Sequence, residues 1–424
     1  MRVEQGLSCL SFEYYVHFVR NIRTSVKVFV VFYYNKQKEM KKLNASLVMI
    51  LLSMAGFTGC QQSGSQHDDL ITVDVSASYP EKELVLQDFM EVEYVPLETN
   101  DEFITQGIVE AIGKKVIVVR NMRDGNIFVY DRATGKGIKK INRFGQGAEE
   151  YSGINSIILD EDNSEMFVSD YPARKISVYD LSGNYKRSFK YADTGYYDDI
   201  FNYDRDHLIC YKKYSTPKED EQACHLLVSK QDGSVTREIR IPYKAYKTPV
   251  IMKDELTVVP EFHLMFPSQN NWILVNTSSD TLYNYLADGN MYPIIVRTPS
   301  INTMETEVFL FPTVITDRYY FMRTMKKELD YKTFKGFPGT DLFYDKQEKT
   351  LSQFTMYNGD YSNKRSISFL FKPRNSEIAI SQSLQAPDLV EAYEKGQLKG
   401  KLKEIAAGLD EEANPVIMLA KYKK

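Results

Sequence analysis

Histidine, aspartate and glutamate side chains are the groups in this chain that could hold a catalytic metal. Beyond residue 69 the only histidines are His207, His225 and His263. His207 and His225 lie on two predicted strands that flank residues 214–222, so both come from one hairpin and are poorly placed to bind a metal held jointly by several sheets. Carboxylates are too numerous to single out a pair. The sequence also has no Gly-x-Ser-x-Gly elbow, phosphate loop or zinc-type cysteine spacing. We therefore predict no catalytic residues, no metal ligands and no cofactor.

Cys210 and Cys224 could form a disulfide across the same hairpin. Their positions centre the hairpin at Pro217, which would place the two side chains opposite each other and within about 5 Å at Cβ. In an oxidising periplasm such a bridge would add roughly 3 kcal/mol by closing a loop of about 15 residues. The alternative is a pair of buried thiols that are out of register by one or more residues.

Cys60 ends a segment that resembles a bacterial lipoprotein signal. Lys41 and Lys42 form a short basic region, residues 43–57 are apolar, and Thr58 and Gly59 precede the cysteine. The resemblance implies that residues 40–59 are removed, that Cys60 is lipidated and that residues 60–69 form a tether. Met40 lies directly before this signal and could itself be the first residue of the protein, so we expect residues 1–39 to be a mis-assigned upstream segment.

Charge and composition limit the partners of the remaining chain. Residues 1–60 hold 8 of the 53 Lys and Arg and 3 of the 57 Asp and Glu, which leaves 45 against 54 and a formal charge of about −9. This balance argues against nucleic acid as a partner. Gln61 is not the aspartate that retains some lipoproteins in the inner membrane, so we expect an outer-membrane lipoprotein that faces the periplasm and touches the membrane through its lipid only.

A strand and its following turn recur along the body. Residues 154–159, 165–169, 175–179 and 185–190 read as four strands separated by turn-rich segments. The third of these strands has counterparts elsewhere, and the equivalent positions Tyr130, Tyr179, Ser229, Tyr285 and Tyr344 are 49, 50, 56 and 59 residues apart. Four of the turns contain a glycine, at Gly135, Gly183, Gly233 and Gly289.

Repeats of this length, each a small antiparallel sheet, are typical of a β-propeller. We predict an all-β fold over residues 70–424, a six-bladed propeller of four-stranded antiparallel blades. The sixth blade would combine residues 366–371, 377–381 and 415–422 with an N-terminal strand from residues 70–97, which would hide the edges of an open array. The competing fold is a pair of β-sandwiches, which would not explain why the same turn recurs after the third strand of each repeat.

Three segments resemble the six-bladed propeller lipoproteins of Gram-negative gut bacteria, which are relatives of NHL-repeat propellers. These segments are Ile141-Asn142-Arg143-Phe144-Gly145-Gln146-Gly147 with Glu150-Tyr151 and residues 154–180, then residues 92–99, then residues 414–419. The resemblance covers nearly all of residues 70–424. The chain departs from the pattern Gly-Gln-Gly-Pro-Gly-Glu-Tyr at Ala148 and Glu149. Because this family mostly lacks an assigned activity, the resemblance implies a fold more than a function.

The two faces of the predicted ring differ in loop length. The first turns, which join the first and second strands of each blade, are short, and so are the third turns. The first turns lie at residues 113–114, 160–163, 204–206, 316–318 and 372–375. Second turns grow longer, at residues 214–222 and 324–340 and in an insertion at about 384–414 with two helical stretches. We call the side that carries second turns and blade-to-blade links the insertion-bearing face. The insertion would pack against blade six, across the rim, or partly cover the channel as a lid or docking helix.

Loops of this kind often carry recognition residues, although neutral drift also lengthens them. The candidate ligand-binding residues on the insertion-bearing face combine charge with an aromatic ring and a glycine-flanked link: Arg143, Gln146, Glu150, Asp170, Tyr171 and Arg174. The same residues would also suit solvated turns. We predict a lipid-anchored, non-catalytic module that binds a glycan, a peptide or an envelope protein through this face. The alternatives are a metal-dependent hydrolase or lyase of the propeller type, and a sensor or structural subunit.

Overall fold

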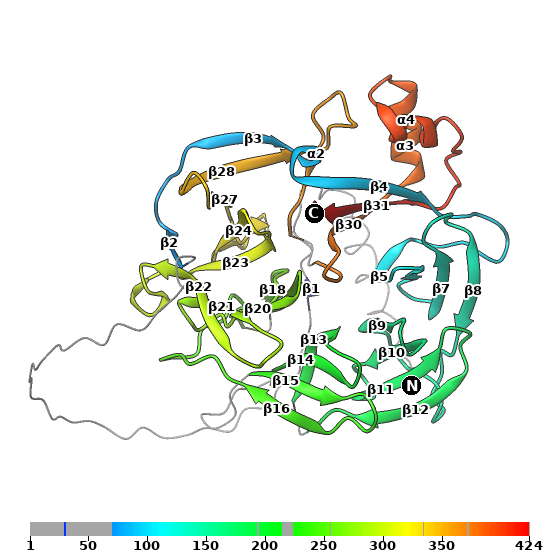
Figure 1. Ribbon diagram of the computed structural model, residues 1–424, viewed down its shortest axis with the longest axis horizontal. Helices are drawn as coiled ribbons and strands as arrows, with labels where there is room; N and C mark the ends of the chain where they lie inside the picture. Colours follow the sequence, from blue (N-terminus) through cyan, green and yellow to red (C-terminus); the bar gives the residue numbers. More distant parts are fainter. Residues whose placement is uncertain are drawn as a thin grey trace, which may run out of the picture.

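Six β-sheets stand around a common axis in the computed structural model (Figure 1). The structure describes residues 29–30 and 70–423, apart from residues 193–194, 214–223, 255, 334 and 371–372. Cys60 and the predicted signal and tether, residues 40–69, lie outside the described residues. The predicted all-β, six-bladed propeller is confirmed.

The first three blades are four-stranded and antiparallel, with the earliest strand of each nearest the axis. Blade one holds β5 (Ile108–Ile112), β6 (Val116–Arg120), β7 (Asn126–Asp131) and β8 (Gly137–Asn142). Blade two holds β9 (Ser156–Asp160), β10 (Glu165–Asp170), β11 (Lys175–Asp180) and β12 (Tyr185–Lys190). Blade three holds β13 (Tyr196–Asn202), β14 (His207–Lys213), β15 (Cys224–Ser229) and β16 (Val235–Ile239).

The other three blades recruit strands from the start of the chain. Blade four holds β19 (Met265–Ser268), β20 (Asn271–Leu274), β21 (Thr281–Tyr285) and β22 (Met291–Thr298), with β2 (Ile71–Asp74) added outside. Blade five holds β23 (Val308–Ile315), β24 (Tyr319–Lys326), β27 (Asp341–Asp345) and β28 (Thr350–Tyr357), with β3 (Glu81–Val85) and β29 (Ser366–Ile367) paired to β28. Blade six holds β30 (Ile378–Leu384), β31 (Val416–Tyr422) and β4 (Met90–Pro96). Two small hairpins lie outside these blades: β17 (Ile251–Lys253) with β18 (Leu256–Val259) in the link between blades three and four, and β25 (Leu329–Asp330) with β26 (Lys335–Gly336) in the second turn of blade five. Strand β1 (Phe29–Val30) pairs with β18.

Residues 71–96 form an N-terminal strap that passes along three blades. Strand β2 runs parallel to β22, and β3 runs parallel to β28. After the single turn of α2 (Leu86–Phe89), β4 pairs antiparallel with β31 over seven residues and closes the ring. The predicted N-terminal closing strand is therefore confirmed, while the two parallel outer strands are an additional feature of the fold.

One predicted strand of blade six belongs to blade five. Ser366 and Ile367 pair with Tyr357 and Met356 of β28, so the expectation that residues 366–371 begin blade six was wrong. The chain reverses just after β28, where the Asn358 N–H donates to the Arg365 carbonyl at 3.1 Å. The first residues after this loop of residues 358–365 pair back with the strand that precedes it, and blade six has three strands among the described residues.

The insertion in blade six contains two helices, as predicted. Helices α3 (Ala386–Glu394) and α4 (Gly400–Ala406) lie between β30 and β31, at the outside of the ring (Figure 1). Their buried side chains join one apolar cluster with strands of blades five and six, through Leu389, Leu402 and Met418. Packing against the rim is the arrangement observed, and the channel is left uncovered by these helices.

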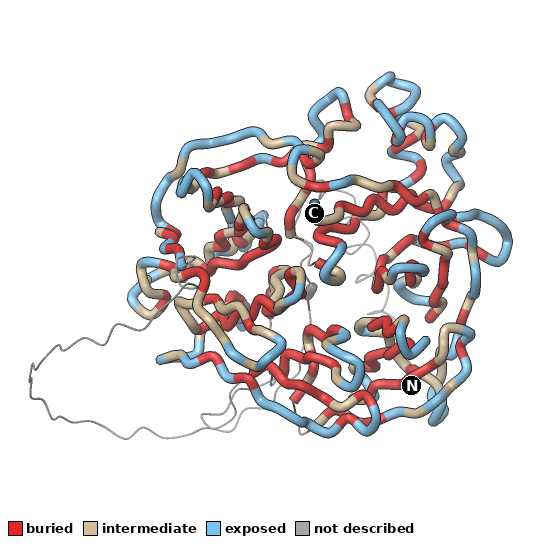
Figure 2. Tube along the Cα trace, in the orientation of Figure 1, coloured by how far each residue is buried: buried red, intermediate tan, exposed pale blue. Residues whose placement is uncertain are grey.

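Buried side chains lie on the strands and between neighbouring blades, and exposed ones follow the loops and outer edges (Figure 2). The outermost strands carry charge where they face solvent. Exposed residues on these edges include Glu81, Lys82 and Glu83 of β3, Lys139 of β8, and Lys186 and Lys190 of β12.

A buried ion-pair network joins blades two and three. The Arg187 guanidinium donates to both oxygens of Glu165, at 2.7 Å each, and to the Lys230 carbonyl at 2.8 Å. The Lys230 ammonium reaches back to Asp160 at 2.5 Å. Both side chains of that second pair are nearly inaccessible, at 5% and 2% exposed.

Acid should weaken this network at Glu165. Hydrogen bonds from Arg187 and Lys186 lower the pKa of Glu165 from 4.5 to about 2, against the opposing effect of burial. The unfolded chain therefore takes up a proton below about pH 4.5, while the folded chain resists until about pH 2, so stability falls as the pH drops between these values. We expect Glu165→Gln to lower the free energy of unfolding at pH 7 and to have a much smaller effect at pH 3, measured by urea denaturation. Glu404→Gln, in an exposed pair on α4, is the control, and an equal loss at both pH values for Glu165→Gln would contradict the assignment.

Candidate functional site

β-Bulges interrupt the innermost strands of four blades. The register shifts between Val109 and Ala111 in β5, between Tyr197 and Ile200 in β13, between Pro312 and Val314 in β23, and between Ile378 and Ile380 in β30. A bulge turns a side chain out of the regular alternation of a strand, and bulges are common beside binding sites. The bulge in blade one lies at Glu110, which lines a cavity at one mouth of the channel.

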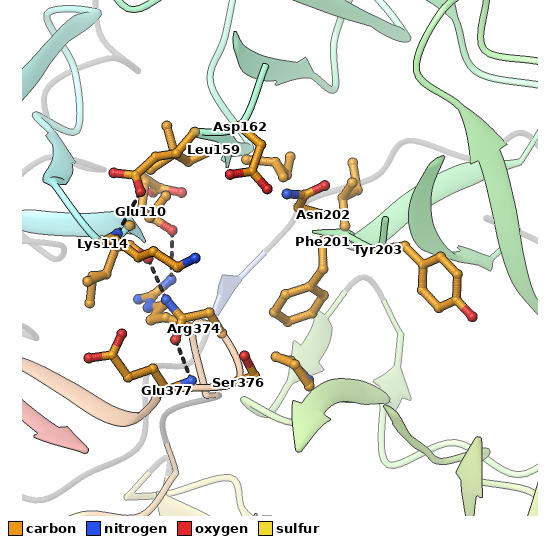
Figure 3. A pocket seen from close by; sticks show the side chains of 18 of the residues that line it. Glu110, Lys114, Leu159, Asp162, Phe201, Asn202, Tyr203, Arg374, Ser376 and Glu377 are labelled. Carbon is orange, nitrogen blue, oxygen red and sulfur yellow. Dashed lines mark hydrogen bonds between the residues drawn. The ribbon is translucent and has the colours of Figure 1, made fainter. Parts of the chain in front are cut away.

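This axial cavity measures about 500 Å³ and opens on the face that carries the first turns. Five of the six blades contribute to it, through the inner strands of blades one to four and the loop that leads into blade six (Figure 3). Its size falls in the range of pockets that enclose small ligands. The cavity lies opposite the insertion-bearing face.

The carboxylates around the axial cavity are mostly held by protein groups. Glu110 accepts from Arg120 at 2.8 Å and from the Ile157 N–H at 3.2 Å. Glu161 accepts three backbone N–H groups of the first turn of blade one, those of residues 114, 115 and 116, at 2.7 to 3.0 Å. Glu377 pairs with Arg132 at 2.9 Å.

A glycine makes the Glu161 contact feasible. A Cβ at Gly113 would lie 2.1 Å from Glu161 Oε1, so any side chain there would displace the carboxylate that fixes the turn. The carboxylate of Asp162, by contrast, has no hydrogen bond or ion pair with any described residue.

The positive groups of the cavity lack such partners. Arg374 donates to Ser381 Oγ at 3.2 Å and to the carbonyl of Glu110 at 3.3 Å, but it forms no ion pair with a described residue. Lys114 is exposed at the first turn of blade one, and its ammonium has no described partner. Burial lowers the pKa of Arg374, against attraction from Glu110 and Glu261.

The opposite side of the cavity is aromatic and amide-rich. Trp272 packs against Phe201 with ring centroids 5.5 Å apart and against Tyr203 at 5.8 Å. Asn202, Asn270 and Asn271 border the same side. Figure 3 shows Arg374 and Lys114 facing Phe201 and Asn202 across the opening. The cavity thus has one charged wall and one apolar wall edged with amides.

The residues predicted on the insertion-bearing face do lie at that edge, but most have internal partners. Arg143 Nε donates to the Gly183 carbonyl at 3.1 Å, and Glu150 accepts from the Gly147 N–H at 2.7 Å. Gln146 is exposed in the link between them.

The second half of the predicted set forms a separate cluster. Asp170 is buried and accepts from the Ser152 N–H at 2.7 Å. Tyr171 stacks on Tyr196 at 4.5 Å, and the Arg174 guanidinium lies 4.6 Å from the same ring. These contacts order the loops, and a binding role for the six residues stays a prediction.

Cys210 and Cys224 are free, buried thiols. The register pairs Cys210 with Leu226 and Cys224 with Lys212, so the cysteines are diagonal neighbours rather than opposed residues. Diagonal positions are about 7–8 Å apart, too far for a bridge. Direct opposition centred on Pro217 was wrong, because the observed register is centred one residue later.

Two of the three histidines share a carboxylate neighbour, since Asp199 Oδ1 lies 3.7 Å from His263 Nδ1 and Asp199 also attracts His225. His207 contacts Asp204 at 3.0 Å on the first-turn side of blade three. His225 is buried and its Nε2 lies 3.0 Å from the Leu264 carbonyl, which links blades three and four. Burial lowers the pKa of His225 to about 4, so it is uncharged at neutral pH. In the ranges that the structure describes, no three His, Cys, Asp or Glu side chains are grouped as metal ligands would be.

The first turns lie on the face predicted from the sequence, but no binding role was predicted for them. The available signal was charge: Lys114 and Asp162 lie in the first turns of blades one and two, and Arg374 lies in the loop that leads into blade six. Short loops from several blades can build a pocket together without any one of them being long.

Comparison with known proteins agrees with the fold. Residues 70–421 match a family described as a domain of unknown function, DUF4934. The chain belongs to this family. No match was found among curated proteins.

Solved structures of other proteins resemble this chain. A Bacteroides fragilis protein described as a candidate exported protein is 12% identical, with a TM-score of 0.54, over 84% of this chain and 99% of that one. A DUF4221 family member from Bacteroides vulgatus is 8% identical, with a TM-score of 0.43, over 79% and 97%. At such identities the first likeness shows the fold alone, and the second is too weak to argue from. No helix in the described part of the chain has the length and apolar character that crossing a bilayer requires.

Proposed function

We propose that this DUF4934 protein is a non-catalytic binding module of the bacterial cell envelope that takes a small polar ligand in the axial cavity. The observation that carries the proposal is the cavity of about 500 Å³ built by the inner edges of five blades. Its wall presents Arg374, Lys114 and Asp162, which form no ion pair with another residue that the structure describes, opposite Phe201 and Trp272. A site with a few convergent polar groups and an apolar wall is the usual form of a ligand pocket.

An envelope location is supported by two independent features. The chain contains the lipoprotein-like signal that ends at Cys60, which would anchor the ring to a membrane by lipid. The structural neighbour from Bacteroides fragilis is described as a candidate exported protein. The proposed ligand is therefore a glycan or peptide of the envelope, and the orientation we expect is toward the periplasm.

Blocking the cavity tests the proposal. Ser376 is exposed and lines the opening, so Ser376→Trp should fill the mouth without disturbing a buried contact. Gln146→Trp places the same bulk on the insertion-bearing face. Immobilised wild-type protein and both variants would be incubated with the small-molecule fraction of a native envelope extract, and the retained compounds would be identified by mass spectrometry.

We expect Ser376→Trp to abolish retention and Gln146→Trp to preserve it, because only the first occupies the cavity. Loss of retention in Gln146→Trp alone would contradict the proposal and move the site to the insertion-bearing face. Thermal unfolding of both variants controls for misfolding.

The insertion-bearing face is the second candidate, for contact with an envelope protein. Ile104, Met122 and Phe144 are 63%, 57% and 53% exposed there, on loops at one end of blade one. Large apolar side chains gathered beside Arg143 and Gln146 suit a protein contact more than a small polar ligand. Retention of a protein by the wild type and by Ser376→Trp, but not by Gln146→Trp, would support this second function.

A further inference from the structure

Large apolar side chains that are exposed gather on one face of the ring. Six of them lie in second turns or blade-to-blade links, all on the insertion-bearing face: Ile104, Met122, Phe144, Tyr246, Met252 and Tyr331. Tyr393 of α3, in the helical insertion, is a seventh. The other exposed ones lie on the strap or on outer strands, and none of those in the described part of the chain lies in a first or third turn. The face on which the axial cavity opens is therefore polar by comparison.

Three of these side chains form a cluster at one end of blade one. The Met122 N–H donates to Gln106 Oε1 at 3.1 Å, two residues after Ile104, so the second turn of the blade is held against the incoming link. Phe144 packs against Gly125 of the same turn, where a Cβ would lie 2.5 Å from the Phe144 Cβ. The three apolar side chains thus project from loops that are fixed to one another.

A second cluster lies beside blade four. The hairpin of β17 and β18 carries Met252, which is 70% exposed, and the turn between β25 and β26 carries Tyr331. The Lys253 ammonium lies 4.2 Å from the centre of the Tyr331 ring, so the two hairpins meet. Tyr246 precedes the first hairpin in the same link. Tyrosine and lysine beside an apolar side chain are typical of groups that lie at a membrane interface.

The positions of the two clusters favour a flat partner. Blade four stands opposite blade one in the ring of six, so the clusters lie on two sides of the axis and on the same face (Figure 1). A protein bound at blade one would cover the first cluster only. A lipid bilayer is a flat apolar partner that can contact both clusters at once.

A bilayer is also within reach of the chain. Strand β2 begins with Ile71 on the outer edge of blade four, eleven residues after Cys60, the predicted site of the lipid. About ten residues span at most roughly 33 Å, which is enough for either face of the ring to turn toward the membrane. The lipid would supply the attachment, and contacts that are weak by themselves would then be sufficient to orient the ring.

Charge does not drive this contact. The loops of the insertion-bearing face also carry exposed carboxylates, such as Glu102 and Glu149, and the chain beyond Cys60 is acidic. The contact should therefore depend on the apolar side chains and change little with salt concentration.

We propose that the insertion-bearing face lies on the bilayer to which the chain is anchored. The clusters around Met122 and Met252 enter the headgroup region, and the axial cavity opens away from the membrane. This inference rests on the envelope location in the proposed function, and it adds the orientation of the ring and the lipid partner of this face.

Lipid-attached quenchers can measure which face meets the bilayer. The full chain would be expressed with its own signal, purified from membranes and reconstituted into vesicles of phosphatidylethanolamine and phosphatidylglycerol that contain a nitroxide-labelled lipid. Met122→Cys, Met252→Cys and Ser376→Cys, each labelled with bimane, report on the two clusters and on the opposite face. Cys210 and Cys224 are buried, and the unsubstituted chain gives the labelling background.

We expect bimane at Met122→Cys and Met252→Cys to be quenched about threefold more than at Ser376→Cys, because apolar groups at the headgroup boundary lie about 5–10 Å deep. Ile138→Cys is the matched control. Ile138 is 54% exposed and equally apolar, but it lies on the outer strand β8, so its probe should show as little quenching as that at Ser376→Cys.

Charge placed in both clusters should release the face from the bilayer. The double variant Met122→Glu with Met252→Glu is expected to lower the quenching of bimane at Tyr246→Cys about threefold, since each carboxylate would have to enter the lipid. Ile138→Glu in the same labelled chain should leave that quenching unchanged. Thermal unfolding of the variants controls for misfolding.

Stronger quenching at Ser376→Cys than at Met122→Cys would place the first-turn face on the bilayer and overturn the inference. No quenching at any position, quenching of the blade-one cluster alone, or no effect of the two glutamates would overturn it as well. If Met122→Cys is shielded in native envelopes but not in vesicles of lipid alone, its partner is a protein, and the inference is wrong. Ligand retention by the axial cavity is measured on immobilised protein without a bilayer, so the proposed function succeeds or fails independently.

Discussion

A chain that begins at Thr99, without residues 70–98, is expected to show no cooperative unfolding transition. Strand β4 pairs with β31 over seven residues, and its Val95 is buried in the same cluster as Leu419 of β31 and Phe128 of blade one. Removing β4 opens blade six and exposes an apolar strand edge, so the ring can no longer close. Circular dichroism during heating and size-exclusion chromatography would detect the loss.

A chain that begins at Pro80 is the matched control. Of the three strands of the N-terminal strap it lacks only β2, and the partner of β2, blade four, keeps its own four strands. Ile71 and Val73 leave the core, so we expect a folded protein with a lower Tm. A cooperative transition in the chain that begins at Thr99, similar to that of the full chain, would show that closure by β4 is not required.

Lys230→Ala should lower the free energy of unfolding by about 3–5 kcal/mol. The substitution leaves Asp160, only 2% exposed, as a buried carboxylate without its cation. It also removes donors from the carbonyls of Asp204 and Arg205, which shape the first turn of blade three. Urea denaturation at pH 7 would measure the change.

Two comparisons make the Lys230 prediction specific. Lys186→Ala breaks another lysine–carboxylate pair, that with Glu165, but Lys186 is 42% exposed, so we expect a loss below about 1 kcal/mol. The double variant Lys230→Met with Asp160→Asn removes both charges and should recover much of the stability. Equal effects of Lys230→Ala and Lys186→Ala would contradict the importance of burial.

The repeated pattern around Tyr130, Tyr179 and Tyr285 was sufficient to predict the ring. Each of these tyrosines lies in the third strand of a blade, and glycine adopts positive φ in the turn that follows, from +72° at Gly135 to +87° at Gly289. At Gly135 a Cβ would lie 1.9 Å from the Pro96 carbonyl, so that turn also packs against the closing strand. The local sequence was enough here because the turn needs a positive φ, which glycine adopts readily and few other residues do.

The outer strands and the end of blade five could not be predicted in the same way. A strand pattern says which residues alternate, but it does not say which free edge the strand will join. Strands β2 and β3 therefore look like lone segments until their parallel partners β22 and β28 are known. The two residues of β29 were assigned to the wrong blade because only the turn at Asn358 sends them back.

The axial cavity was beyond sequence reasoning for a geometric reason. Lys114, Phe201, Trp272 and Arg374 come from four blades and are brought together only by closure of the ring. The bulge at Glu110, a residue that lines the cavity, leaves no mark in residue type. Loop length, the feature that guided the predicted site, instead marked the opposite face.

The charged outer strands have a consequence for crowding. Each blade ends in a strand with an open edge, and such edges invite another molecule to add its own sheet and begin lateral polymerisation. Pairing at these edges would remove the hydrating water from the charged lysine and glutamate side chains on β3, β8 and β12. Many copies can therefore lie close together without pairing edge to edge, and the mouth of each channel stays accessible to diffusing molecules.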